Sequence, residues 1–410
     1  MKIFGDIKWN NISLKGKAAI IVTFMLLFLS YPYVFNRFFS APPEQLLIIL
    51  CFLIMIIIGI GIKNNNSLPS IINVFFLVQG LFWIMFFYYH SDSSYLVRIF
   101  FLIVTYSIIW ALVKTNSLNE FICINNGILT IQSVLGAIAF WLVLTGVLGS
   151  FAEFTNTDNR TLYWYGISCT NTKIGNIIRP SGFFDEPGAL ACWGIYALIF
   201  NKLFCGSKKV EICLIIGLFF TLSVAYFIQI FFYFLFYSSK KKALITVVII
   251  GIVGFFVYHY IENNEILRYL TIDRFEGGTI RSDRNELSEM AKGYFFRNPL
   301  MGMGAKNMDK AAYMADNQYE ILAKDGLIGA VITYLPFFYL LIKFRGNFKI
   351  LSALFILALG YLQRPFHINE MHYLMMYTFV VMLLFNYGKK RKIYEQSRKS
   401  DSCHRLLQLS

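Results

Sequence analysis

The sequence predicts an all-α, polytopic integral membrane protein with about 12 transmembrane helices, arranged as a single membrane domain over 1–410. Hydrophobic residues make up 57% of the 410 positions and charged residues 15%, whereas an ordinary soluble domain has about 25% charged residues. Many windows of roughly 17–25 residues contain almost no charge, which is the length that a helix needs to cross the hydrocarbon core of a bilayer. Short lysine clusters separate these windows.

The first apolar run follows four lysines and has no A-x-A-like cleavage site, so we expect a retained span rather than a signal peptide. Lysine clusters are typical of cytoplasmic loops under the positive-inside rule. The apolar windows predict spans at 18–36, 45–62, 70–89, 95–113, 128–149, 189–204, 243–261, 321–342, 350–365 and 371–388, and the rule orients them with the N-terminus inside. Both termini, including the tail 389–410, are then cytoplasmic. The same clusters account for most of the net charge of +14, so nucleic acid is not an expected partner.

One apolar stretch, 210–239, is too long for a single straight span. Its 30 residues would form a helix of about 45 Å at 1.5 Å per residue, whereas the hydrocarbon core is about 30 Å thick. A short broken hairpin of two helices keeps the lysines at both of its ends inside. We expect its turn at Thr221, Leu222 and Ser223, because hydroxyl groups can bond the backbone that a turn exposes at membrane depth.

Two segments, 150–188 and 262–320, are then the larger external loops and the places where chemistry is expected. The first ends in RPSGFFDEPG, 179–188, which combines an arginine and two acids with helix-breaking Pro and Gly residues just ahead of a span. Unwound backbone suits an anion, and the planar fork of a guanidinium donates two parallel hydrogen bonds to a phosphate. Arg179 is therefore a candidate anion ligand.

Two adjacent acids follow this arginine in the sequence. Asp185 or Glu186 could act as a general base, since a carboxylate within hydrogen-bond reach can accept a proton from a hydroxyl group. The alternative is that both acids pair with Arg179 or solvate the loop. Both roles stay open for these residues.

The second external loop contains a predicted amphipathic helix that starts at Asp283 and stops at Asn298-Pro299. Asp283 and Glu286 form a capping pattern, and the apolar residues that follow recur at helical spacing. The spacing puts Arg284 on the apolar face of this helix. A buried arginine needs an anionic partner, so Arg284 is a second candidate anion ligand. Pairing with Glu286, or reaching toward lipid headgroups, is the alternative.

A third cluster, DNQYEILAKDGLIG at 316–329, lies where the second loop enters the next span. Asp316 is either the N-cap of that helix or a general base at the outer rim. Gly326 and Gly329 would allow close helix packing. The seven cysteines show no C-x-x-C spacing, so the sequence predicts neither a metal site nor a disulfide framework.

Together these clusters resemble the bacterial O-antigen polymerase and O-antigen ligase superfamily. The resemblance covers about 150–345, and the order and spacing of its elements carry it. Those elements are R-x-S-G-x-F-x-E-P at 179–187, the T-x-S turn at 221–223, Arg284 ahead of N-P-L-x-G-x-G at 298–304, and D-N-x-Y followed by G-L-I-G at 316–329.

The resemblance implies a C-type glycosyltransferase that needs no cofactor or metal and works at the outer face of the bacterial inner membrane. Its substrate would be an undecaprenyl-diphosphate-linked oligosaccharide. In such proteins arginines of the two outer loops hold the donor diphosphate, a role that falls here to Arg179 and Arg284, with Arg281 nearby. A carboxylate, Asp316 or Glu186, would activate the acceptor hydroxyl. Expected partners are the lipid-linked oligosaccharide, membrane lipids and a chain-length regulator protein.

The resemblance favours a repeat-unit polymerase for O-antigen or capsule, a step in lipopolysaccharide or other polysaccharide biosynthesis. Ligases that transfer the chain to lipid A-core carry a histidine where the second loop enters its span, and Asp316-Asn317 stand there in this chain. The family's usual arginine after the T-x-S turn is also missing, since Val224 occupies that position. A ligase is the alternative within the class.

Two further readings belong to other classes. A polysaccharide flippase or transporter would also have many spans, but transporters place ionisable residues at mid-span and often show two related halves. In this chain the charges gather in loops of unequal size. A structural membrane scaffold would not require capped helices with inward-facing arginines. We therefore expect an enzyme.

Overall fold

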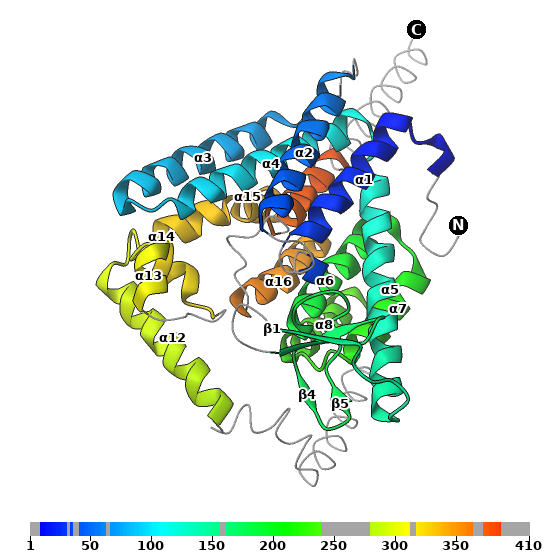
Figure 1. Cartoon of the computed structure of the whole chain (residues 1–410). Coiled ribbons are helices and arrows are strands. Elements are labelled where there is room, and N and C mark those ends of the chain that lie inside the picture. Colours follow the sequence, from blue (N-terminus) through cyan, green and yellow to red (C-terminus); the bar gives the residue numbers. More distant parts are fainter. Residues whose placement is uncertain are drawn as a thin grey trace, which may run out of the picture.

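The computed structural model describes residues 9–30, 33–35, 41–62, 66–155, 161–238, 279–311, 317–363 and 372–386. The structure is 74% helical, which confirms the predominantly helical fold that the composition predicts (Figure 1). The predicted span 243–261 and the tail 389–410 lie outside the described residues.

Five helices among the described residues are long and apolar enough to cross a membrane. They are α3 (Ser70–His90), α4 (Ser94–Lys114), α5 (Leu118–Leu144), α6 (Pro187–Phe200) with the π-helix Asn201–Cys205, and α14 (Glu320–Thr333) with α15 (Leu335–Lys343). The other helices of the bundle are α1 (Leu14–Leu29), α2 (Ala41–Ile60), α7 (Lys208–Phe219), α8 (Val224–Tyr237), α16 (Phe348–Gln363) and His372–Asn386. The total of about 12 spans stays a prediction.

The helices pack around one apolar core. In Figure 1, α3 and α4 lie side by side, and α14 packs against α3. On the other side of the molecule α5 packs along α6 and α7, while α8 packs against α16. Large aromatic side chains fill the space between helices, and Trp83 and Trp193 are fully buried.

The predicted hairpin over 210–239 is confirmed as α7 and α8, with 12 and 14 residues. Tyr233 donates to Glu211 and Tyr226 donates to the Ile215 carbonyl, so residues early in α7 face residues late in α8. The two helices therefore run antiparallel. At 1.5 Å per residue they are about 18 and 21 Å long, shorter than a hydrocarbon core of about 30 Å.

The segment between α5 and α6 contains short strands, which the all-α prediction did not include. Strands β1 (Ala152–Thr155), β2 (Thr161–Trp164) and β3 (Cys169–Thr170) form an antiparallel sheet, and β4 (Lys173–Ile174) pairs with β5 (Ile177–Ile178). Thr, Tyr, Phe and Trp are frequent here, and these residues favour strands. The runs are too short to produce a clear alternating pattern in the sequence.

One end of the bundle, which we call the loop end, carries contacts between segments that the lysine pattern predicts to be external. It also carries a contact from one of these segments to the α7–α8 turn. The hydrogen bonds are short, 2.7–3.1 Å, and connect residues far apart in the sequence. The pairs are Val34 with Phe183, His90 with Met301, Asp92 with Lys306, and Arg179 with Leu222.

Contacts at the other end, the lysine end, join segments predicted to lie on the opposite side. Lys15 donates to the Gly61 carbonyl, the Sγ atoms of Cys123 and Cys205 are 2.6 Å apart, and Tyr237 donates to the Lys349 carbonyl. Which end faces out stays a prediction of the positive-inside rule.

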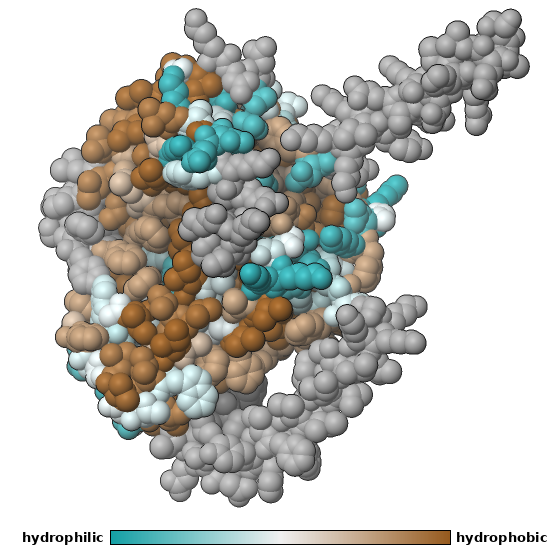
Figure 2. All heavy atoms as spheres, turned by 90° about the vertical axis from the view of Figure 1, so that its right-hand side faces the viewer, coloured by the Kyte–Doolittle hydropathy of each residue, from teal (hydrophilic) through white to brown (hydrophobic). Residues whose placement is uncertain are grey.

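The surface carries large exposed apolar side chains on α3, α4, α5 and α7. Examples are Leu77, Ile103, Trp141 and Ile216, with exposures of 63%, 48%, 55% and 58%. Figure 2 shows one face of the molecule, where hydrophobic residues form broad areas between clusters of hydrophilic ones. Soluble monomers rarely expose such large apolar areas, and a lipid-facing surface explains them.

Candidate functional site

The structure describes the side chains of two of the five predicted site residues. Arg179 and Glu186 lie in the loop ahead of α6. Arg281 and Arg284 lie in α12 (Thr279–Arg297), whose side chains are described from Leu287 onward, and Asp316 lies outside the described residues. The side-chain contacts of the Arg179 cluster are therefore described. For Arg281 and Arg284 the structure gives the helix on which they lie.

The predicted amphipathic helix is confirmed as α12, with a corrected start. It begins at Thr279, so Asp283 lies inside the helix and is not its N-cap. Nothing in the sequence TIRS, 279–282, breaks a helix, and the helical conformation continues through it. α12 ends at Arg297, immediately before Asn298-Pro299, as predicted.

The start of the next helix also differs from the prediction. Tyr319 occupies the N-cap position of α14, so Asp316 is not the N-cap of that helix. The side chain of Asn317 instead accepts a hydrogen bond of 2.9 Å from the amide of Tyr319. Such an Asx turn ends the loop locally, which is a common role of Asn.

The loop that carries Arg179 is folded onto β3. The amide of Ser181 donates to the Cys169 carbonyl at 2.8 Å, and the amide of Cys169 donates to the Gly182 carbonyl at 2.6 Å. Gly182 has φ of +60°, and a Cβ there would lie 3.0 Å from the side-chain oxygen of Gln132. A side chain is therefore disfavoured twice at this position, by backbone strain and by contact.

Arg179 connects this loop to the turn of the α7–α8 hairpin. Its side chain is buried, and Nε donates to the Thr221 carbonyl at 3.0 Å while Nη2 donates to the Leu222 carbonyl at 3.1 Å. Leu222 has φ of +48°, so the turn presents carbonyls that a helix would have used internally. A guanidinium fits here because it donates from several fixed directions. The sequence singled out both elements but not their contact.

The two acids lie at the start of α6. Asp185 is buried, and Glu186 is the N-cap residue with extended backbone (φ −150°, ψ 153°). The Glu186 side chain makes no capping hydrogen bond, and Pro187 begins the helix, a position that suits proline. The structure therefore brings Arg179, Asp185 and Glu186 to one short loop at a helix start.

The second cluster is organised by a break in α14 at Gly326 (φ 66°, ψ −171°). The break frees two carbonyls and two amides that a continuous helix would pair with each other. The segment 299–304 pairs with all four of them at 2.8–3.1 Å. Ala323 and Lys324 accept from the amides of Met303 and Gly304, and the amides of Leu327 and Ile328 donate to the carbonyls of Pro299 and Leu300.

We call these two segments, 298–304 and 323–329, the glycine clamp. A Cβ on Gly302 would lie 2.4 Å from the Lys324 carbonyl oxygen, and one on Gly326 would lie 2.3 Å from the Leu300 carbonyl oxygen. Both glycines also have positive φ. The clamp therefore requires glycine at both positions, which explains why the motifs N-P-L-x-G-x-G and D-G-L-I-G occur together.

A buried ion pair joins the clamp to α4. Arg98 Nη1 is 2.6 Å from Asp325 Oδ2, and both side chains are 0% exposed. Tyr95 donates from its hydroxyl to Asp325 Oδ1 at 2.9 Å. The guanidinium also stacks over Trp83 at 4.8 Å from the ring centroid. Two apolar helices, α4 and α14, are therefore joined by a pair that neither could bury alone.

The sequence motifs did not predict this pair, although a signal was present. Arg98 is the one charged residue within the predicted span 95–113, and a lone ionisable residue in an apolar span usually marks a buried partner. Asp325 lay within the cluster 316–329 without being singled out. Only the packing of α14 against α3 and α4 brings the two together.

The turn between α3 and α4 contacts the clamp at Met301 and the chain just after the clamp at Lys306. His90 Nε2 lies 3.0 Å from the Met301 carbonyl oxygen, and Asp92 Oδ2 accepts from the Lys306 amide at 2.7 Å. Burial opposes ionisation of Asp92, but the amides of Ser94 and Lys306 bond to its carboxylate, and the net effect lowers the pKa of Asp92 below its ordinary value.

A cavity of about 650 Å³ lies between the start of α5 and the end of the helix His372–Asn386, where Asn116, Glu120 and Asn386 are among its lining residues. None of the predicted site residues in the described part of the chain lines it.

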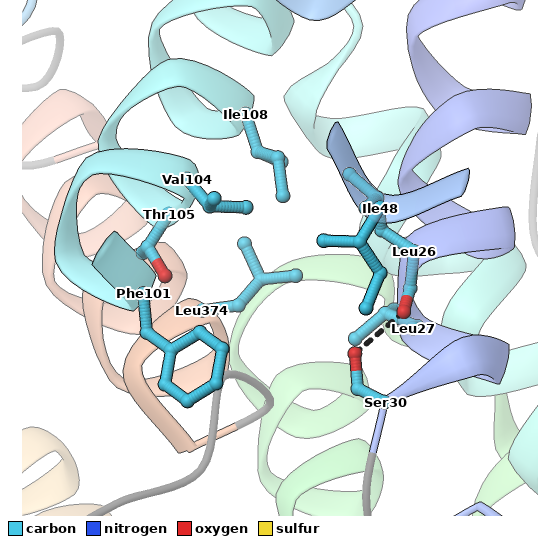
Figure 3. A pocket seen from close by; sticks show the side chains of 9 residues that line it. All are labelled: Leu26, Leu27, Ser30, Ile48, Phe101, Val104, Thr105, Ile108 and Leu374. Atoms are coloured by element: carbon cyan, nitrogen blue, oxygen red, sulfur yellow. Dashed lines mark hydrogen bonds between the residues drawn. The ribbon is translucent and has the colours of Figure 1, made fainter. Parts of the chain in front are cut away.

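A second cavity, of about 10 Å³, lies between α1, α2, α4 and the helix His372–Asn386. Figure 3 shows its lining side chains, which are mainly apolar, such as Leu26, Ile108 and Leu374. Its dashed line marks Ser30 donating to the Leu26 carbonyl. This is a packing gap near the size of one water. Among the described residues, no group of three or more His, Cys, Asp or Glu is placed to hold a metal ion.

The chain matches no protein-family model, no curated protein and no solved structure. The relation to the O-antigen polymerase and ligase superfamily stays a hypothesis that rests on the motifs.

Proposed function

We propose that this chain is a membrane glycosyltransferase that polymerises oligosaccharide repeat units carried on undecaprenyl diphosphate, at the outer face of the bacterial inner membrane. The observation that supports this most is the fixed position of Arg179. Its guanidinium is buried at the loop end, bonded to two carbonyls of the α7–α8 turn, within a few residues of Asp185 and Glu186.

Such an arrangement suits a diphosphate leaving group. As the glycosidic bond to the lipid carrier breaks, negative charge develops on the diphosphate, and cations that are already in place stabilise that charge without reorganising. The two hydrogen bonds from Arg179 to the turn fix the position of its guanidinium. Arg281 and Arg284 of α12 are the proposed second source of positive charge.

The loop-end geometry favours an enzyme over a transporter. The fully buried ion pair of Arg98 with Asp325 occurs at the fifth residue of α4 and the sixth of α14, near the helix starts rather than at mid-span. A transporter would place its ionisable groups near the bilayer midplane. Polymerase is preferred to ligase because Asp316-Asn317 stand where the ligases carry histidine.

A deletion strain tests the proposed function. Without the polymerase, lipopolysaccharide should carry a single repeat unit, because ligation continues. Loss of every attached unit, with polymer accumulating on the lipid carrier, would identify a ligase instead. Unchanged polymer in the deletion strain would remove the chain from this pathway.

Complementation then tests the role of Arg179. Arg179→Ala should abolish polymer at normal protein level, and Arg179→Lys should restore little because lysine lacks the planar fork. Arg297→Ala is the matched control, since Arg297 is an exposed arginine at the end of α12 that stacks on Tyr294. Normal polymer in the Arg179→Ala strain would exclude that residue from the site.

A further inference from the structure

The proposed reaction needs a base, and the structure points to an acid that the sequence motifs did not single out. Glu320 is the first residue of α14, four residues after Asp316 in the chain. Its side chain is 8% exposed, and Oε1 accepts from Lys324 Nζ at 2.9 Å. A carboxylate at a polar rim that is nearly buried and still reachable fits a general base.

Two other acids near the glycine clamp already use both of their carboxylate oxygens. Asp92 uses both oxygens, one for the Ser94 amide and one for the Lys306 amide. Asp325 likewise uses one oxygen for Arg98 and the other for Tyr95. Within the described part of the chain, the hydrogen bonds of the Glu320 carboxylate involve Oε1 and Lys324. The Oε2 atom is therefore the one available to a substrate hydroxyl.

The glycine clamp fixes the position of this acid. The break at Gly326 separates a short first segment of α14, which carries Glu320, Lys324 and Asp325. The segment is held at its far end by the carbonyls of Ala323 and Lys324, which accept from the clamp. Rigid support of this kind keeps a catalytic group within the narrow geometry that proton transfer needs.

The same segment packs against the helix that carries the proposed diphosphate ligands. Ala323 of α14 is fully buried in a small cluster with Ala291 of α12 and Met308 of α13 (Ala305–Ala311). Arg284 precedes Ala291 by seven residues, close to two helical turns along α12. Glu320 on α14 and the proposed cations Arg281 and Arg284 on α12 therefore belong to two helices that pack against each other.

From this arrangement we infer that Glu320 is the general base of the transferase and that Lys324 is its positioning residue, an inference that rests on the proposed function. Glu320 Oε2 accepts the proton of the acceptor hydroxyl as that oxygen bonds the anomeric carbon of the donor sugar. The bond from this carbon to the diphosphate breaks, and its electron pair leaves with the undecaprenyl diphosphate. Lys324 stays protonated throughout and holds the carboxylate in place through Oε1.

The test compares variants in the deletion strain and as purified enzyme acting on a lipid-diphosphate repeat unit. Glu320→Gln should lower the rate per folded molecule by about 10²–10⁴-fold, the range of general-base catalysis, which exceeds what any fall in melting temperature from the unpaired Lys324 would explain. Lys324→Gln keeps a donor toward Glu320 and should lose less. Glu289→Gln is the control, since Glu289 is an acid of α12 that is 72% exposed.

The outcomes separate this inference from the proposed function. If deletion stops polymerisation but Glu320→Gln restores normal polymer, the inference is wrong and the function stands; loss of activity in Asp316→Asn or Glu186→Gln would then locate the base elsewhere. If Glu320→Gln does not fold, Glu320→Asp keeps the acid one methylene shorter. That variant should show a lower turnover number with an unchanged KM, and an unchanged turnover number would also contradict the inference.

Discussion

The guanidinium of Arg98 and the carboxylate of Asp325 form a 2.6 Å ion pair that joins α4 to α14 with no solvent exposure of either side chain. Asp325 belongs to the glycine clamp and immediately precedes the break at Gly326. The ion pair therefore ties the irregular part of α14 to the regular α3–α4 pair. Two charges buried in an apolar bundle stabilise it only as long as both are present.

Removing one partner should destabilise the protein strongly. Arg98→Gln or Asp325→Asn is expected to lower the free energy of unfolding by about 3–5 kcal/mol, because one buried charge is left uncompensated. The double variant Arg98→Met with Asp325→Leu should be closer to the parent than either single variant. Thermal unfolding in detergent measures the three changes, and additive effects would mean that the two residues do not interact.

The glycine clamp predicts sharp differences between glycines. Gly302→Ala and Gly326→Ala should each cost at least about 2 kcal/mol, because both have positive φ and a Cβ would meet a backbone carbonyl. Gly293→Ala in α12 is the control, since nothing lies within 4 Å of a Cβ there, and it should stabilise the helix by about 0.5–1 kcal/mol. Melting temperatures of the purified variants check the order.

Acid should loosen the contact between the α3–α4 turn and the clamp. The pKa of Asp92 is lower in the folded protein than in the unfolded chain, so its contribution is fully present above the unfolded value of about 3.9 and is lost as the pH falls through the folded value. Asp92→Asn should remove this part of the pH dependence. The melting temperature between pH 7 and pH 3 measures it, and parallel curves for parent and variant would contradict the assignment.

The Cys169 thiol should resist alkylation in the folded protein. It is fully buried beside the Arg179 loop, and burial raises its pKa to about 12, so almost no thiolate exists at pH 8. A maleimide should modify Cys169 only after denaturation, and mass spectrometry of the labelled peptide reports this. Cys213 on α7 is more exposed and serves as the comparison. Rapid labelling of native Cys169 would show that the loop opens.

Local signals in the sequence predicted the helices well. Long apolar windows located α3 to α6, and the excess length of 210–239 together with the lysines at both ends predicted the α7–α8 hairpin and its turn at Thr221–Ser223. These features are encoded within 10–30 adjacent residues. Predictions of the same kind were less accurate at helix starts, as with Asp283 and Asp316, because a polar residue near a helix start need not be its cap.

The strands between α5 and α6 escaped prediction for a related reason. β3 to β5 have two residues each, too few for a period of two to stand out. β3 also bonds outside the sheet, since Cys169 exchanges backbone hydrogen bonds with Ser181 and Gly182 of the RPSG loop. These hydrogen bonds are tertiary contacts, which no local sequence pattern predicts.

By itself, the sequence determined that the chain forms apolar helices and that its charged motifs collect in two loop segments, since hydropathy and helix-breaking residues act locally. Only the tertiary structure decided what those motifs do. It showed that Arg179 bonds the hairpin turn, that Gly302 and Gly326 serve one clamp, and that Arg98 has Asp325 as its partner. These relationships join residues 24–227 positions apart, and burial in a shared apolar core, rather than any neighbouring residue, makes each of them necessary.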